Sequence, residues 1–232
     1  IKDGTKGPID RYRNRLIWPV KNLTGDVVGF GARKLASDDV DQGPKYLNTS
    51  ETPIYKKSQL LYGLDMAKKE IAKKRQVVIV EGYTDVMAAH LAGIETAVAT
   101  CGTAFGDEHI RILRRLLMDD DAFRGEVIFT FDGDAAGQKA ALRAYEDDQK
   151  FVTQTFVAVE PNGLDPCELR QEHGDAALRD LIASRIPLFE FAIRTELKKH
   201  DLQTAEGRVN ALAATAPMVA SIKNKVLRPE YV

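Results

Sequence analysis

The sequence predicts an α/β protein with a largely parallel sheet at its centre. Short β-branched apolar runs alternate with helical patterns between residues 76 and 161, as expected for a parallel sheet covered by helices. Residues 1–75 carry 16 Lys and Arg against 9 Asp and Glu. Beyond Pro166 only helical patterns remain. We therefore expect three parts: a basic mixed α/β N-terminal subdomain (1–75), a catalytic core (76–161) and a C-terminal helical subdomain (162–232).

The N-terminal part opens with a polar entry segment. Two strands at 16–20 and 27–30 are predicted to form a hairpin, because the turn between them contains Gly25, which readily takes a positive φ. The other elements expected here are a loop at 36–53 and a helix at 64–74.

The core alternates strands and helices. Val77–Val80 is a continuous β-branched run, typical of a strand buried on both faces. Further strands are expected at 96–99, 127–131 and 155–159, and helices at 86–92, 107–118 and 135–149. Gly93 is expected to end the first of these helices, and Asp107 to cap the second. The tail is predicted to form helices at 175–185, 188–199 and 203–214.

Composition narrows the classes of function. The chain is 44% hydrophobic and 29% charged, as globular proteins are, and no apolar run is long enough to cross a membrane. There is no secretion signal, and Cys101 and Cys167 form no C-x-x-C pair, so we expect a cytoplasmic protein without disulfides or structural zinc. Because the first residue is Ile1, we expect a piece of a longer protein. The basic part suggests a polyanionic partner.

Acidic residues follow three of the four predicted strands. They are Glu81 and Asp85 after the first strand, Asp132 and Asp134 after the third, and Glu160 and Asp165 after the fourth. Ligands of parallel sheets bind at the carboxyl ends of the strands, so these side chains are expected at one edge. Like charges held close together repel, which favours a divalent cation between them. Since all the candidate ligands are carboxylate oxygens, Mg²⁺ or Mn²⁺ fits better than zinc.

Each acidic motif also has a purely structural interpretation. Asp132 and Asp134 can form a strand-to-helix turn with a helix cap, and Asp85 can serve as an N-cap. Asp165, followed by Pro166, can cap a helix as readily as bind a metal. Because the two motifs lie at equivalent strand ends, the metal site is favoured for Asp85, Asp132 and Asp134. Both interpretations stay open for Asp165.

The two acidic motifs resemble a known fold. Residues 80–86 (VEGYTDV) and 131–137 (FDGDAAG) are similar to the Toprim fold of bacterial primases, type IA and II topoisomerases and some nucleases. The amino-acid sequences of both motifs resemble those of bacterial DNA primases of the DnaG type in particular. Further matches to that family lie at Arg13–Arg15, Gly29–Arg33, Lys45–Thr49 and Leu61–Leu64. The resemblance spans about residues 8–200 and corresponds to the family's RNA polymerase domain.

The resemblance implies a function and a set of site residues. The implied activity is DNA-templated synthesis of short RNA primers by nucleotidyl transfer from ribonucleoside triphosphates. Catalytic Mg²⁺ or Mn²⁺ would be held by Glu81, Asp85, Asp132, Asp134 and Asp165. Nucleotide phosphates and template would be contacted by Arg13, Arg15, Arg33, Lys45, Tyr46, Asn48 and Lys57. Tyr46 and Tyr55, which lie between basic residues, are expected to stack on bases.

One departure from the family concerns the third acidic site. The family often carries D-P-D there, whereas this chain has Asp165-Pro166-Cys167, followed by Glu168. A thiol is a poor ligand for Mg²⁺, so either the second acid is dispensable or Glu168 replaces it.

The resemblance also implies partners. Single-stranded DNA template, ribonucleoside triphosphates and an RNA primer are expected, together with a replicative helicase that binds through a family domain outside this chain. A zinc ion is expected only on another family domain absent from this chain, and no membrane is expected.

Three rival classes use similar motifs. A Toprim nuclease or topoisomerase shares the acids, but the motifs outside that fold match primases. A recombination mediator with a Toprim fold would need a four-cysteine zinc site. A haloacid-dehalogenase-type phosphatase gives no role to Glu81.

Overall fold

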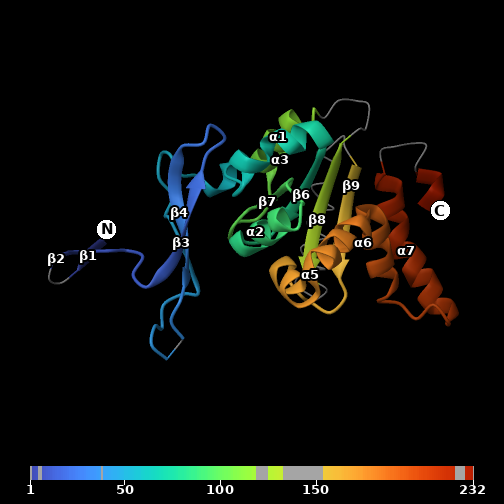
Figure 1. The fold of residues 1–232 in the computed structure, drawn as a ribbon. Coiled ribbons are helices and arrows are strands. Elements are labelled where there is room, and N and C mark those ends of the chain that lie inside the picture. The colour runs from blue at the N-terminus through green and yellow to red at the C-terminus, as the bar shows by residue number, and fades with distance from the viewer. Residues whose placement is uncertain are drawn as a thin grey trace.

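The computed structural model describes residues 2–4, 7–37, 39–118, 125–132, 154–222 and 228–231. At its centre lies a five-stranded sheet with strand order β10-β9-β8-β6-β7 (Figure 1). The strands are β6 (Gln76–Val80), β7 (Ala97–Ala99), β8 (Glu126–Asp132), β9 (Gln154–Glu160) and β10 (Ile186–Pro187). The first four run parallel, and β10 pairs antiparallel with β9. The predicted parallel sheet is therefore confirmed.

Helices cover both faces of this sheet (Figure 1). Those packed on β6 are α1 (Leu64–Lys74), α2 (Tyr83–Leu91), α3 (Asp107–Leu117) and α5 (Pro166–Ala183). The remaining helices are α6 (Leu188–Leu197), which contacts β9 and β10, α7 (Ala205–Ser221), which packs on α6, and the short η1 (Lys57–Gln59) and η2 (Arg228–Tyr231). On β6, Val77 and Ile79 are buried in one cluster with residues of α1 and α3, and Val78 and Val80 in another with residues of α2 and α5. A strand buried on both faces explains the continuous apolar run.

The N-terminal subdomain is a separate antiparallel sheet beside the central one. Its strands are β3 (Arg15–Lys21), β4 (Val27–Lys34) and β5 (Tyr46–Asn48), in that order. Gly25 turns the β3–β4 hairpin at a φ of 100°, as predicted. The hairpin of β1 (Lys2–Gly4) and β2 (Gly7–Ile9) projects away from the rest of the molecule (Figure 1). Trp18 and Val20 on the inner face of the sheet pack against Tyr55 and Tyr83.

Several predicted elements need correction. Strands β1 and β2 lie in the supposed entry segment, β5 lies in the supposed loop at 36–53, and β10 follows Pro166, where no strand was expected. These strands have only two or three residues each, too few to show a periodic pattern, and they are held by pairing with their neighbours. The helix expected at 135–149 lies outside the described residues.

Two helix boundaries also differ. Gly106, not Asp107, is the N-cap of α3, and the side chain of His109 accepts its backbone N–H at 3.2 Å. The tail helix expected at 175–185 is the second half of α5, which is interrupted at Gly174 by a φ of 83°. The predicted bounds 64–74 coincide with those of α1. Among the helices of the described residues, none is both long and apolar enough to cross a membrane.

Candidate active site

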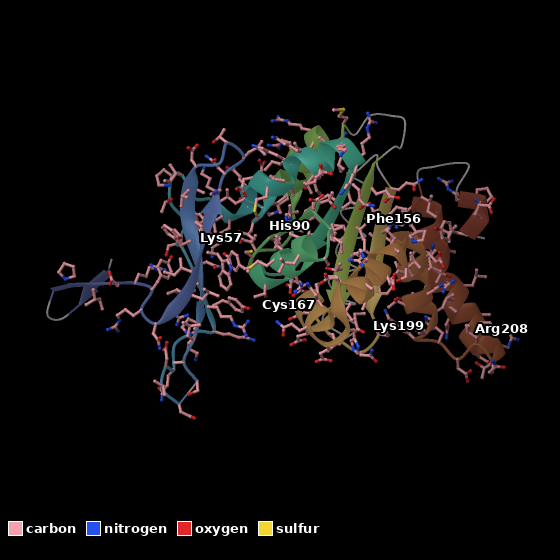
Figure 2. All side chains as sticks on the ribbon, in the orientation of Figure 1. Lys57, His90, Phe156, Cys167, Lys199 and Arg208 are labelled. Atoms are coloured by element: carbon pink, nitrogen blue, oxygen red, sulfur yellow. The ribbon has the colours of Figure 1, made fainter. Side chains whose placement is uncertain are left out.

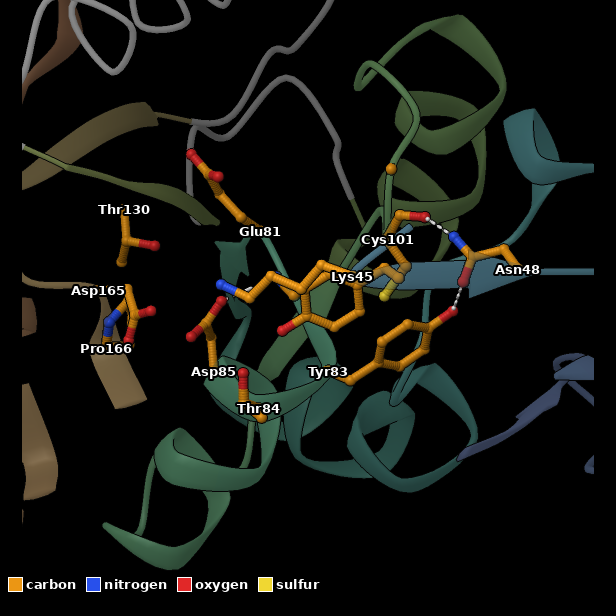
Figure 3. Close-up of a pocket in the computed structure, with 13 residues that line it drawn as sticks. Lys45, Asn48, Glu81, Tyr83, Thr84, Asp85, Cys101, Thr130, Asp165 and Pro166 are labelled. Carbon is orange, nitrogen blue, oxygen red and sulfur yellow. Dashed lines mark hydrogen bonds between the residues drawn. The ribbon is translucent and has the colours of Figure 1, made fainter. Parts of the chain in front are cut away.

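A cavity of about 290 Å³ lies between the carboxyl end of β6 and strand β5 (Figure 3). Its acidic lining comes from Glu81, Asp85 and Asp165, and β5 with its preceding residue supplies Lys45, Tyr46 and Asn48. The Lys45 side chain extends across the cavity toward Asp85 (Figure 3). The fold thus brings predicted acids and predicted basic residues, which are distant in the sequence, to one place.

Asp85 is a buried carboxylate of this site with a raised pKa. It is 4% exposed in the first turn of α2, and its Oδ2 accepts the backbone N–H of Gly82 at 2.8 Å. Its Oδ1 has no hydrogen-bond partner of normal geometry among the described residues. Loss of hydration on burial, and then the negative charge of Asp165, raise the pKa of Asp85 to about 7. The backbone N–H groups of Gly82 and Cys167 oppose this rise in pKa only in part.

Asp165 has the capping role that the sequence offered, and it also lies at the cavity. It is the N-cap of α5, where its Oδ1 accepts the N–H of Glu168 at 2.7 Å, and Pro166 occupies the first helical position. It also lines the cavity, and its charge acts on Asp85. The cap fixes the position of the Asp165 side chain without removing it from the cavity.

Two neighbouring acids have structural contacts of their own. Glu160 is 4% exposed, and its carboxylate accepts the backbone N–H groups of Asn162 and Leu164 at 2.7 and 2.8 Å. It therefore shapes the turn that leads to Asp165. Glu168 accepts the backbone N–H of Asp165 at 3.3 Å and completes the capping box. Glu168 is not among the described residues that line the cavity.

The second acidic motif is described only at its start. Asp132 ends β8 opposite Glu160 of β9, at the carboxyl edge predicted for it, whereas its side chain and all of Asp134 lie outside the described residues. Within the described part of the chain, no three His, Cys, Asp or Glu side chains are grouped closely enough to hold a metal ion. A five-carboxylate site therefore stays a prediction.

The seven residues predicted to contact nucleotide phosphates or template divide into two groups. Lys45, Tyr46 and Asn48 line the cavity, and the Arg33 guanidinium lies 5.8 Å from the centre of the Tyr46 ring. Arg13, Arg15 and Lys57 are absent from the described lining.

Two of these outlying residues have local contacts. The Arg15 side chain is 6% exposed and donates to the Pro44 carbonyl at 2.8 Å. Lys57 lies at the junction of the N-terminal part with α3 (Figure 2), where its carbonyl contacts Nε2 of His109 at 3.1 Å. Tyr55 is 3% exposed and packs against Gly29, so the expectation that it stacks on bases is wrong.

Comparison with known proteins gives the family. The family model "DNA primase catalytic core, N-terminal domain" matches residues 1–68, and "Toprim domain" matches residues 75–159. The crystal structure of the RNA polymerase domain of Mycobacterium tuberculosis primase DnaG has 57% sequence identity and a TM-score of 0.87, covering 99% of this chain and 72% of that one.

The chain belongs to the DnaG-type DNA primase family.

Other members of the primase family agree with this assignment. A DNA primase of Streptomyces coelicolor is 64% identical over 223 residues, which are 96% of this chain and 34% of that protein. A DnaG primase catalytic domain solved bound to single-stranded DNA has 33% identity and a TM-score of 0.80, covering 99% of this chain and 72% of that one. The chain spans about a third of the length of the curated primases that it matches. The Toprim match implies dependence on a metal in general terms.

A third match corrects one expectation. The family model "DnaB-helicase binding domain of primase" matches residues 189–232, whereas no such segment was expected in this chain. These residues form most of α6 together with α7 and η2, and the helical pattern alone carries no signal of a helicase partner. Membership in the primase family also sets aside the topoisomerase, recombination-mediator and phosphatase alternatives.

Two residues with structural roles around this site were not singled out from the sequence of the primase chain. Tyr83 is 2% exposed and stacks on Trp18 with ring centres 5.0 Å apart, and burial raises its pKa. His109 is 1% exposed and bridges α3 to η1. Their roles depend on contacts between distant segments, so no local pattern could have identified them.

Proposed function

We propose that the chain is the catalytic RNA polymerase domain of a DNA primase, which synthesises short RNA primers on single-stranded DNA from ribonucleoside triphosphates. The observation that carries the proposal is the cavity in which Lys45 and Tyr46 face Glu81, Asp85 and Asp165. Relatives solved with a double-stranded DNA oligomer that has an overhang, and with single-stranded DNA, support DNA as the template.

Mg²⁺ or Mn²⁺ fits the acidic side of this cavity. Oδ1 of Asp85 is buried and has no hydrogen-bond partner of normal geometry among the described residues, a position that a cation or a proton would satisfy, and the nearby donors are carboxylates. Glu81, Asp85, Asp132, Asp134 and Asp165 would hold the ions. When bound, such ions activate the attacking 3′-hydroxyl of the primer and neutralise charge on the α-phosphate as pyrophosphate leaves.

The basic side of the cavity binds and orients the nucleotide. The Lys45 ammonium lies 6.0 Å from the centre of the Tyr46 ring, and Arg33 lies at a similar distance from the same ring. Tyr46 is 38% exposed, so a base can stack on it while the two cations attract the phosphates. Arg13, Arg15 and Lys57 lie farther out and are proposed to contact template or outer phosphates.

The wider setting of the reaction follows from the same proposal. The RNA primer is the growing product. A replicative helicase is the partner suggested by the match at residues 189–232. A replication enzyme of this kind works in the cytoplasm.

A primer-synthesis assay tests the proposal. The chain is incubated with single-stranded DNA, labelled ribonucleoside triphosphates and Mn²⁺, and the products are separated by size. We expect short RNA from the parent and none from Asp85→Asn, while the exposed Asp180→Asn variant behaves like the parent. Cleavage of the DNA without RNA synthesis would point to a Toprim nuclease and contradict the proposal.

A further inference from the structure

Tyr83 connects the acidic motif to the N-terminal sheet. It lies two residues after Glu81 and two before Asp85, at the first position of α2. Its ring is buried on the inner face of the N-terminal sheet, between Trp18, which stacks on it, and Tyr62, which meets it edge-on at 4.7 Å. A residue inside the acidic motif is therefore fixed by a different subdomain.

The N-terminal sheet offers a row of three residues that fits this ring. Trp18 on β3 pairs with Gly31 on β4, and Gly31 pairs with Asn48 on β5. A Cβ at Gly31 would overlap the Tyr83 ring, so glycine leaves the space that the ring fills. The sheet thus receives Tyr83 with a stacking ring on one strand, a gap on the next and a polar side chain on the third.

Asn48, at the end of this row, makes a hydrogen bond with each end of its side-chain amide. Its Nδ2 donates to the Cys101 carbonyl at 2.9 Å, and its Oδ1 accepts from the Tyr83 hydroxyl at 3.0 Å (Figure 3). A carbonyl can only accept, so this contact fixes which end of the Asn48 amide faces Cys101. Cys101 lies in the loop after β7, and with Gly102 it has a positive φ, which turns the chain there. One amide therefore ties β5 to the start of α2 and to the loop after β7, at the edge of the central sheet.

The position of β5 matters because it carries the nucleotide-facing residues. Tyr46 is its first residue and Lys45 precedes it, and both line the cavity. β5 is a three-residue edge strand that pairs only with β4 among the described strands. Asn48 supplies side-chain hydrogen bonds from β5 to residues of the central sheet's edge, close in the chain to Lys45.

We propose that Tyr83 and Asn48 are positioning residues for the nucleoside triphosphate, and that their hydrogen bond sets the separation between the basic and acidic sides of the cavity. In this role Asn48 acts through Tyr83 and the Cys101 carbonyl and makes no direct contact with nucleotide or template. The inference rests on the proposed function, because it assumes that a triphosphate spans the cavity.

A double-mutant cycle in binding tests this role. The variants are Tyr83→Phe, Asn48→Ala and the two combined, and Tyr62→Phe is the matched control, since it removes a hydroxyl from the same aromatic cluster. Affinity for ATP in the presence of Mn²⁺ is measured by calorimetry, affinity for Mn²⁺ alone is measured in parallel, and thermal melting checks folding.

We expect Tyr83→Phe to weaken ATP binding roughly fivefold and Asn48→Ala roughly tenfold, as one and two hydrogen bonds predict. The double variant should be no weaker than Asn48→Ala, because both changes break the same link. Mn²⁺ affinity should stay unchanged in all variants, and Tyr62→Phe should bind ATP like the parent. A loss limited to ATP affinity separates positioning from a general loss of stability.

Three results would overturn the proposal. Multiplying effects in the double variant, roughly fiftyfold in total, would mean that Asn48 contacts the nucleotide independently of Tyr83. Single variants that bind ATP like the parent would contradict the positioning role and leave the proposed function intact. A parent chain that binds neither Mn²⁺ nor ATP would contradict the proposed function together with the role that rests on it.

Discussion

At the scale of single residues, Asp85 is the carboxylate on which the proposed cation site depends. The carboxylate of Asp85 is buried in the first turn of α2, whose N-cap is Gly82, and Asp165 adds a second negative charge nearby. Both effects disfavour the ionised form, which a cation or a proton would relieve. We therefore expect the arrangement to cost stability in the absence of metal, and a bound cation at the proposed site to offset that cost.

The ionised, buried Asp85 should lower the stability of the folded chain, and comparing the parent with an Asp85 variant at different pH values should reveal this effect. The pKa of Asp85 is about 7 in the folded chain and 3.8 ordinarily, so between these values the folded state holds a proton that the unfolded state has released. The contribution of Asp85 to stability therefore falls as pH rises from about 4 to 7. In chelator-treated buffer we expect Asp85→Asn to melt roughly 3–6 °C above the parent at pH 8 and close to it at pH 4.

Thermal melts of the parent, Asp85→Asn and the exposed control Asp180→Asn across that pH range measure the effect. An Asp85→Asn variant that melts well below the parent at pH 8 would mean that the carboxylate is needed as a cap more than it is strained.

The contacts of Glu168 bear on whether it replaces the acid that the family often carries at the position of Cys167. Glu168 is engaged with the backbone N–H of Asp165 in the capping box, and it does not belong to the described lining of the cavity. We therefore expect Glu168→Gln, which keeps an accepting oxygen, to retain primer synthesis within about twofold. Asp165→Asn should abolish synthesis while preserving the cap, since Asn caps helices as well as Asp does.

Primer yields and melting temperatures of both variants, measured side by side, test this distinction. Equal loss of synthesis in the two variants would show instead that Glu168 replaces the missing acid at the third site.

At the scale of secondary-structure elements, short strands and tertiary contacts mark the limit of prediction from sequence. The helix at 64–74 and the four parallel strands have clear periodic or β-branched patterns, and they were placed to within two residues. β5 has three residues whose pairing with β4 depends on contacts far away in the chain. A local pattern cannot report such contacts, and for the same reason Tyr83 was seen only as part of a motif.

His109 illustrates an element contact that can be tested. Its Nδ1 accepts the N–H of Gly106 and its Nε2–H donates to the Lys57 carbonyl, so it joins the start of α3 to η1. Burial lowers the pKa of His109, so it stays neutral in the folded chain. We expect His109→Phe, which retains the contact with Phe105, to lower the melting temperature by roughly 4–8 °C through two lost hydrogen bonds.

The same variant should also change the response to acid. A neutral buried His109 makes the parent lose stability as pH falls below about 6.5, because the unfolded chain then binds an extra proton. His109→Phe should lose that part of the slope, whereas the exposed His173→Ala should keep it. A parent and a His109→Phe variant with identical melting curves from pH 5 to 8 would refute the bridging role.

At the scale of the whole molecule, charge and topology act together. The basic N-terminal sheet lies beside the carboxyl edge of the central sheet, and β5 and β6 meet around one cavity. The sequence allowed the parallel sheet, the charge asymmetry and the strand-end acids to be predicted, because each of them is a local or compositional signal. Which of the residues predicted to contact nucleotide or template reach the cavity depends on how the two sheets pack. Only three of those seven residues line it within the described structure.

Crystals soaked in Mn²⁺ would show whether the strand-end acids hold divalent metal. We expect anomalous peaks in contact with Asp85 Oδ1 and with the acids around it, and the loss of these peaks in crystals of Asp85→Asn. Clear anomalous maps at millimolar Mn²⁺ with no peak beside Glu81, Asp85 or Asp165 would contradict it.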